Sequence, residues 1–142
     1  MATLKSVLAV KGQQVHSVTP AESVFNALKT MAELNVGALL VLDGPKLVGI
    51  LSERDYARKV ILKGRSSLDT PVRDIMTEKV VCVRPDQTVE EAMALMTAHA
   101  VRHLPVMDGN EVAGIISIGD LVKSIIKEQE FVIDQLEHYI HG

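Results

Sequence analysis

The chain has 142 residues, a formal net charge of -3, 47% apolar residues and only 3% aromatic residues, with no tryptophan. This composition predicts a globular protein with an aliphatic core. The balanced charge argues against a nucleic-acid partner bound through a basic surface. No window reaches the roughly 18 apolar residues of a membrane span, and the first residues lack the apolar stretch of a signal peptide, so we expect a cytoplasmic protein with no membrane partner.

The chain consists of two copies of one unit. Residues 15–61 align on residues 80–126 without a gap, and many positions are identical, among them Pro20 with Pro85, Val36 with Val101, and the pairs within "GILSERD" and "GIISIGD". An internal repeat of this kind organises the whole fold. We assign residues 1–62 to the first copy, 63–71 to a polar linker, 72–127 to the second copy and 128–142 to a helical extension.

In chain order, apolar periodicity predicts a strand, a helix, two strands joined at an Asp-Gly turn, and a second helix in each copy. In the first copy these elements fall at 15–18, 21–34, 38–42, 47–52 and 54–62. In the second copy, strand 80–83 precedes a helix capped by Thr88, then a hairpin within 101–117 and a helix from Asp120. Short apolar segments at 4–8 and 72–76, here called the first and second leads, precede the copies.

The predicted fold class is α+β, with two β-α-β-β-α units packed about a pseudo-twofold axis, because one unit has too little core to stand alone. The single Cys82 excludes an internal disulfide, and its place in the apolar run 80–83 predicts a small buried thiol. The extension carries an apolar stripe that needs cover from its own subunit or from a second copy: Val132, Ile133, Leu136, Tyr139 and Ile140.

No motif for catalysis stands out. The chain has no nucleophile elbow, P-loop or dinucleotide fingerprint. His99 and His103 have the i, i+4 spacing of helical zinc ligands, but residues 101–106 read as a strand, so we do not expect a shared helical face. His138 and His141 lack an acidic or cysteine partner in a recognisable pattern, and we predict neither a metal site nor a catalytic residue.

The repeated phrase Gly-aliphatic-aliphatic-Ser-x-x-Asp is the most specific feature. Ser52 and Ser117 end a strand, while Asp55 and Asp120 open the next helix, where a hydroxyl suits a phosphate and a carboxylate suits a ribose diol. The central glycine allows a ligand or another backbone to approach closely. Helix capping and packing would explain the same residues without a ligand.

These residues resemble the cystathionine β-synthase (CBS) domains, which occur in tandem as a Bateman module. The resemblance rests on the repeated unit, on "VRDIMT" and "HLPVMD", and on both Ser-x-x-Asp phrases. It implies a stand-alone bacterial regulatory module that is not an enzyme, has no catalytic cofactor, and binds AMP, ADP, ATP, NAD or S-adenosylmethionine between its repeats. It also implies a homodimer, and it leaves open whether the module acts on a protein target.

Carried over by position, the resemblance implies ribose contacts from Asp55 and Asp120, phosphate contacts from Ser52 and Ser117, and a further contact from Thr77. It implies two unequal clefts, with Arg102 and His103 favouring phosphate at the Asp120 cleft and Arg54 serving the other. The residues expected around adenine are Val15 to Ser17 and Val80 to Cys82, together with Val36 and Val101. Two alternatives stay open: a dimerisation or docking module that binds no ligand, and a nucleotide-acting enzyme with His103 as its base.

Overall fold

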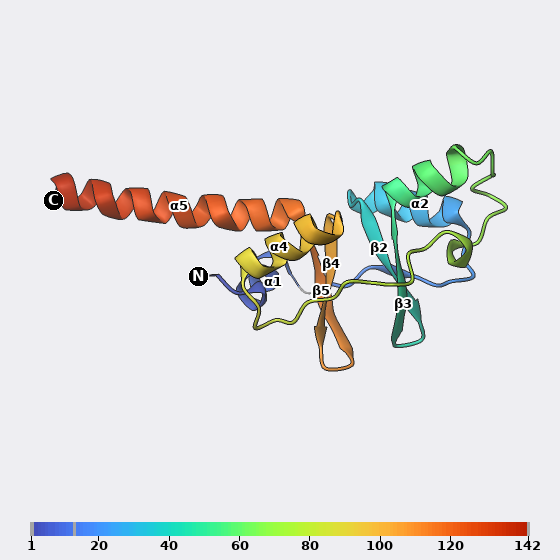
Figure 1. Ribbon diagram of the computed structural model, residues 1–142, viewed down its shortest axis with the longest axis horizontal. Helices are drawn as coiled ribbons and strands as arrows, with labels where there is room; N and C mark the ends of the chain where they lie inside the picture. The colour runs from blue at the N-terminus through green and yellow to red at the C-terminus, as the bar shows by residue number, and fades with distance from the viewer. Residues whose placement is uncertain (1, 13, 142) are drawn as a thin grey trace.

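The computed structural model describes residues 2–12 and 14–141. The first half contains α1 (Leu4–Lys11), β1 (Ser17–Val18), α2 (Val24–Leu34), β2 (Ala38–Asp43), β3 (Lys46–Ser52), α3 (Glu53–Tyr56) and the π-helical segment η1 (Ala57–Ile61). The second half contains the 3-10 turn η2 (Val72–Asp74), α4 (Val89–His99), β4 (His103–Asp108), β5 (Glu111–Ser117) and α5 (Ile118–His141). The β2–β3 and β4–β5 hairpins lie side by side with their turns at the same end, and α5 extends well beyond the body (Figure 1).

Both predicted hairpins are confirmed. β2 pairs with β3 and β4 with β5, all antiparallel, and β1 adds a short parallel strand to β2. Each hairpin turn places its glycine at positive φ, 60° at Gly44 and 64° at Gly109. A glycine adopts this backbone without the steric cost that a β-carbon adds, which is why the Asp-Gly pair marks the turn. The predicted α+β fold is therefore confirmed.

The strand predicted at 80–83 is wrong except at its last residue. Only Val83 bridges to β4, in parallel with Val106, whereas the first copy pairs both Ser17 and Val18 with β2. Pro105 occupies the position in β4 that Leu40 occupies in β2. Proline has no N–H to donate, so the parallel ladder cannot extend past Val83.

Cys82 is exposed, so the predicted buried thiol is also wrong. In the extended segment 80–83 successive side chains point to opposite sides. Val83 is buried and Val81 packs against the second core, which turns Cys82 outward. Partial desolvation still raises the pKa of the Cys82 thiol.

The predicted helices form with shifted bounds. α2 begins at Val24 rather than at residue 21, because the Ser23 hydroxyl caps it by accepting a bond from the Asn26 N–H (3.1 Å). Thr88 caps α4 as predicted, accepting from the Glu91 N–H (3.1 Å). The helix predicted at 54–62 is a single α-helical turn that continues as η1.

Each lead, which in the structure comprises α1 (Leu4–Lys11) for the first copy and residues 72–77 for the second, packs on the opposite copy. Leu4, Val7 and Leu8 of α1 belong to the core of the second copy, whereas Val72 and Ile75 belong to the core of the first. Equivalent main-chain bonds hold each lead on the opposite copy. For the first lead, Leu4 N–H donates to Gln87 O (2.9 Å) and Val89 N–H donates to Ala2 O (3.0 Å). For the second lead, Val72 N–H donates to Glu22 O and Val24 N–H donates to Thr70 O (both 2.8 Å). The molecule therefore has two cores, and each needs both copies.

The glycine of each repeated phrase makes room for a lead. A β-carbon on Gly49 would lie 2.7 Å from the Met76 sulfur and 3.0 Å from the Thr77 carbonyl oxygen. A β-carbon on Gly114 would lie 2.7 Å from a methyl carbon of Leu8. The predicted close approach at these glycines is thus made by the leads themselves.

Among the described residues, no helix combines the length and the apolarity needed to cross a membrane.

Replacing Gly49 with alanine tests this packing. We expect Gly49→Ala to lower the free energy of unfolding by about 1–3 kcal/mol, because the added carbon displaces main chain at Thr77 as well as the Met76 side chain. Gly119→Ala is the matched control, since its nearest atom is the Ser117 hydroxyl oxygen at 3.6 Å. Urea denaturation measures both variants, and an equal loss in the two would contradict the role given to Gly49.

Candidate functional site

Ser52 and Asp55 form a reciprocal cap where β3 turns into α3. The Ser52 hydroxyl accepts from the Asp55 N–H (3.2 Å), while the Ser52 N–H and hydroxyl both donate to Asp55 Oδ2 (3.0 and 3.1 Å). This capping box satisfies main-chain donors that the start of a helix leaves free. It also holds the Asp55 side chain in one orientation.

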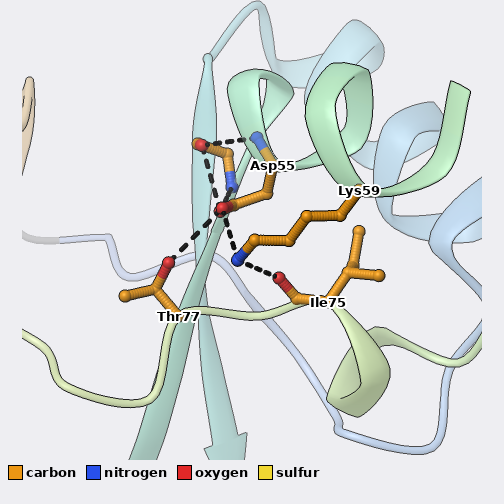
Figure 2. A network of polar contacts seen from close by, with 5 residues as sticks. Asp55, Lys59, Ile75 and Thr77 are labelled. Carbon is orange, nitrogen blue, oxygen red and sulfur yellow. Dashed lines mark hydrogen bonds and ion pairs between the residues drawn. The ribbon is translucent and has the colours of Figure 1, made fainter. Parts of the chain in front are cut away.

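The other oxygen of Asp55 reaches the second lead. Thr77 donates its hydroxyl to Asp55 Oδ1 at 3.4 Å, and Lys59 lies 3.1 Å from the same oxygen while also donating to the Ile75 carbonyl (2.9 Å) (Figure 2). Thr77 is held there by paired main-chain bonds with Ile50 (2.9 and 3.0 Å). The resemblance implied a ligand contact from Thr77 without assigning it to either cleft, and the structure brings Thr77 to Asp55.

Asp120 occupies the equivalent place in the second copy. The Ser117 N–H donates to Asp120 Oδ2 (2.8 Å), and the Ser117 hydroxyl accepts from the Asp120 N–H (3.2 Å). Here the lead contributes Lys11 from the end of α1, whose ammonium donates to Asp120 Oδ2 (2.7 Å) and to the Ile115 carbonyl (2.8 Å). Both carboxylates therefore meet a lead from the opposite copy and a lysine.

Burial alone would raise the pKa of Asp120, but the hydrogen bonds from Lys11 and from the Ser117 main chain outweigh it, so the pKa lies below its ordinary value. Asp120 is thus held as a carboxylate. A carboxylate in this position can accept two hydrogen bonds from a diol once the lysine moves aside.

His103 lies beside the Asp120 site. It pairs with Ser117 across the β4–β5 hairpin and also faces the first copy, since its ring is 3.6 Å from the space a β-carbon on Gly37 would fill. Burial lowers the pKa of His103, the charges of Lys11 and Arg102 lower it further, and Asp120 opposes them. The imidazole is therefore held neutral near pH 7.

The two arginines of the predicted site differ in setting. Arg102 is exposed, and its carbonyl accepts from Ile118 N–H (2.9 Å) at the start of α5. Arg54 reaches across to the other copy and donates to the carbonyl of Ala100 at 3.3 Å. The main chain of Arg102 therefore lies next to the β5–α5 junction, whereas the side chain of Arg54 is engaged in a bond between the copies.

The residues predicted to surround adenine differ in exposure. Val36 packs against the first core and Val101 against the second, while Val15 and Val80 are half-buried. Ser17 and Cys82 are exposed. None of these six lines either of the two cavities described in the next paragraph.

One cavity does reach a predicted site residue. It has a volume of about 620 Å³, lies between α1 and α5, and is lined by Lys11, Asp120, Lys123 and Lys127 among others. Asp120 therefore borders a cavity whose lining also includes three lysines and Glu128. The second cavity, of about 640 Å³, lies near the turn of the β4–β5 hairpin and contains no predicted site residue.

Sequence reasoning missed Lys11. Lys11 stands outside the aligned copies, and only its position at the end of the first lead would have marked it. The exchange of leads, which carries Lys11 to Asp120, has no trace in the repeat itself. His99 is the last residue of α4 and His103 is the first residue of β4, so the two side chains do not share a helical face, as predicted. Among the described residues there is no group of three side chains that could hold a metal ion.

Comparison with known proteins agrees with this architecture. The CBS domain model matches twice, at residues 9–62 and 72–127, so the chain belongs to the CBS-domain family. It is 40% identical to the mitochondrial CBS domain-containing protein CBSX3 of Arabidopsis thaliana, over 99% of this chain and 72% of that protein. It is 52% identical to a CBS-domain protein from Burkholderia ambifaria, with a TM-score of 0.87 over 90% of this chain and 96% of the other.

More distant structures share the fold. The CBS domain pair of protein MJ0100 is 23% identical with a TM-score of 0.80, covers 90% of this chain and 98% of that one, and was solved with 5′-methylthioadenosine and S-adenosyl-L-methionine. A hexameric CBS-CP12 protein from bloom-forming cyanobacteria is 28% identical with a TM-score of 0.76, covering 85% of this chain and 70% of that one.

The Lys11–Asp120 pair gives a pH-dependent prediction. At neutral pH we expect Lys11→Met to lower the free energy of unfolding by about 1 kcal/mol, because the pair is partly buried. The folded pKa of Asp120 lies below its unfolded value, so its contribution is present above pH 3.8 and is lost as the pH falls further. The deficit of the variant should therefore be smaller in urea denaturation at about pH 3 than at neutral pH.

The exposed Lys46 at the start of β3 supplies the control, Lys46→Met. Its effect on stability should be small at both pH values. A deficit of Lys11→Met that persists unchanged in acid would show that the loss comes from packing of the side chain and not from its charge.

Proposed function

We propose that the chain is a regulatory module that binds an adenosine-containing molecule at Asp55 and Asp120 and responds by changing the arrangement of its repeats or of its dimer. The ligand class is AMP, ADP, ATP, NAD or S-adenosylmethionine. The observation that carries the proposal is that each carboxylate, oriented by a Ser-x-x-Asp cap, meets a lead from the opposite copy. The adenosine ligands of the MJ0100 pair, which has the same fold, support the class.

The lysines suggest how ligand and protein would exchange partners. Without ligand, Lys11 and Lys59 occupy one oxygen of each carboxylate at 2.7 and 3.1 Å. A ribose diol whose hydroxyls donate to the aspartate takes the place of the ammonium. The released ammonium is then free to bind a phosphate of the same ligand. Ribose selection and phosphate selection are thereby linked at each site.

The same exchange would couple binding to shape. Lys11 belongs to α1, which packs on the second copy, and the chain then crosses to the first copy at β1. Moving Lys11 away from Asp120 and Ile115 changes the contacts at the point where this crossing begins. A ligand can shift the arrangement only by the difference in its affinity for the two arrangements.

A second candidate is a docking or dimerisation module that binds no nucleotide. It is favoured by one observation: both carboxylates already have ammonium partners. Calorimetry with the five ligands decides between the two candidates. The match to the CBS domain model favours a regulatory over a catalytic role for both candidates. The predicted location remains the cytoplasm.

Substituting the aspartates tests the first candidate. We expect Asp120→Ala and Asp55→Ala each to weaken adenosine-ligand binding at least tenfold at its own site, because each removes two charge-assisted bonds to the ribose. Asp134→Ala, on the exposed part of α5, should bind as the parent does. Isothermal titration measures all three, and affinities unchanged by both aspartate substitutions would rule the ribose contacts out.

Substituting Lys11 tests the exchange. Lys11→Met should leave the affinity for adenosine unchanged or higher, because the diol no longer competes with an ammonium for Asp120. The same variant should bind AMP or ATP about tenfold more weakly relative to adenosine, because a phosphate contact is lost. If adenosine and ATP change by the same factor, Lys11 has no part in choosing phosphorylated ligands.

A further inference from the structure

Two helices that are much longer than their counterparts in the other copy lie against each other. α1 spans Leu4–Lys11, whereas the second lead forms only the three-residue turn η2. α5 spans 24 residues, whereas its counterpart, α3 with η1, ends at Ile61. The first half of α5 runs beside α1 (Figure 1). The cavity of about 620 Å³ between these helices is therefore built from walls that the first copy does not repeat.

One face of each helix lines this cavity, here called the α1–α5 cavity. The first wall consists of Ala2 and the α1 residues Ser6, Val7, Val10 and Lys11. The second wall consists of the α5 residues Asp120, Lys123, Ser124, Lys127 and Glu128. Residues three or four positions apart are neighbours on a helix surface, so each set forms a continuous strip along its helix.

The α1 wall supplies apolar surface. Val7 is nearly buried, with 8% exposed, whereas Val10 is 78% exposed at the edge of the cavity. The methylene stems of the lysines can extend this surface, since a lysine keeps only its ammonium group in water. An aliphatic group in the cavity would remove the Val10 side chain from water, which is favourable. The lining contains no aromatic ring on which a nucleobase could stack.

The α5 wall supplies charge. Lys11 and Asp120 form an ion pair (2.7 Å), so their charges cancel. Glu128 offsets one of the two remaining lysines, Lys123 and Lys127, which leaves one net positive charge in the lining. These two lysines are four residues apart, and their ammonium groups can converge on one anionic group. A ligand with several phosphates would carry more negative charge than this lining balances and would also meet two carboxylates.

We propose that the α1–α5 cavity binds a small amphipathic anion, an aliphatic carboxylate whose chain lies against Val7 and Val10 and whose carboxylate lies between Lys123 and Lys127. The bound molecule bridges α1 and α5 and so holds the first lead on the second copy. The proposal does not depend on adenosine binding, because Lys123 and Lys127 have no part in that site.

Nuclear magnetic resonance titration of the isotope-labelled full chain tests the proposal. The probe is sodium octanoate, and octanamide, which has the same chain length and no charge, is its counterpart. Octanoate should give saturable shifts at the amides of Val10, Lys11, Lys123 and Ser124. Octanamide should bind at least tenfold more weakly, because it cannot form charge-assisted bonds with the lysines. Equal affinities for the two probes, or shifts centred elsewhere in the chain, would overturn the proposal.

Removing the two lysines tests the position of the carboxylate. Lys123→Met combined with Lys127→Met should weaken octanoate binding at least tenfold and leave octanamide binding unchanged. The matched control combines Lys29→Met with Lys46→Met, which removes the same charge from exposed positions of the first copy. Its octanoate affinity should equal that of the parent. An equal loss in both double variants would assign the effect to net charge and contradict the proposed site.

The apolar contact is tested separately. Val10→Ser should weaken the binding of octanoate and of octanamide by about fivefold each, because the aliphatic chain loses contact with Val10. Leu62→Ser is the control, since Leu62 is similarly exposed (76%) and lies outside the cavity. Both variants should fold as the parent does, because residues 10 and 62 belong to neither core. Unchanged affinities in Val10→Ser would refute the placement of the aliphatic chain.

Titrations with AMP and inorganic pyrophosphate distinguish this cavity from the adenosine site. If these anions, and not octanoate, lose affinity when Lys123 and Lys127 are replaced, the cavity extends the phosphate contacts of the Asp120 site and the proposal is wrong. If adenosine ligands fail to bind while octanoate behaves as expected, the proposed function fails and the proposal for the α1–α5 cavity is supported.

Discussion

The exchange of the two leads is the constraint on which the rest of the structure depends. Each lead leaves its own copy and completes the core of the other, fixed by main-chain bonds that are equivalent in the two halves. Buried side chains such as Leu4 and Val72, both fully buried, contribute roughly 1.5–3 kcal/mol each relative to exposure. Neither core is complete without the other copy, so the repeats are joined more firmly than two domains that merely touch.

The same exchange builds the candidate sites. Gly49 and Gly114 are positions without room for a β-carbon, because a lead lies against each of them. The leads in turn carry Thr77 to Asp55 and Lys11 to Asp120. Packing and capping therefore explain the repeated phrase before any ligand is invoked. Packing and capping do not require a lysine beside each carboxylate. Lys59 follows Asp55 by four residues in the first copy, whereas Lys11 reaches Asp120 from the opposite lead. We propose that this difference makes the two candidate sites unequal.

The repeat, the hairpins and both Ser-x-x-Asp junctions could be predicted from the sequence because local patterns determine them: periodicity, Asp-Gly turns and helix caps. The prediction of a strand at 80–83 was wrong because Pro105, a residue distant in sequence, lacks the N–H that pairing with this segment requires. The burial predicted for Cys82 was wrong as well, because Val81 and Val83 face the core and the residue between them therefore points outward. The crossing of the leads could not be predicted, because an apolar segment of four or five residues fits either core equally well by composition.

Native-state hydrogen exchange on a lead variant tests the exchange most directly. Leu4→Ala opens a cavity in whichever core Leu4 fills, and amides of that core lose protection first. If the leads cross as described, protection falls in α4, β4 and β5, while β1 to β3 keep theirs although they are nearer to Leu4 in sequence. Loss of protection centred on residues 17–52, with 89–117 unchanged, would contradict the exchange and with it the origin of both sites.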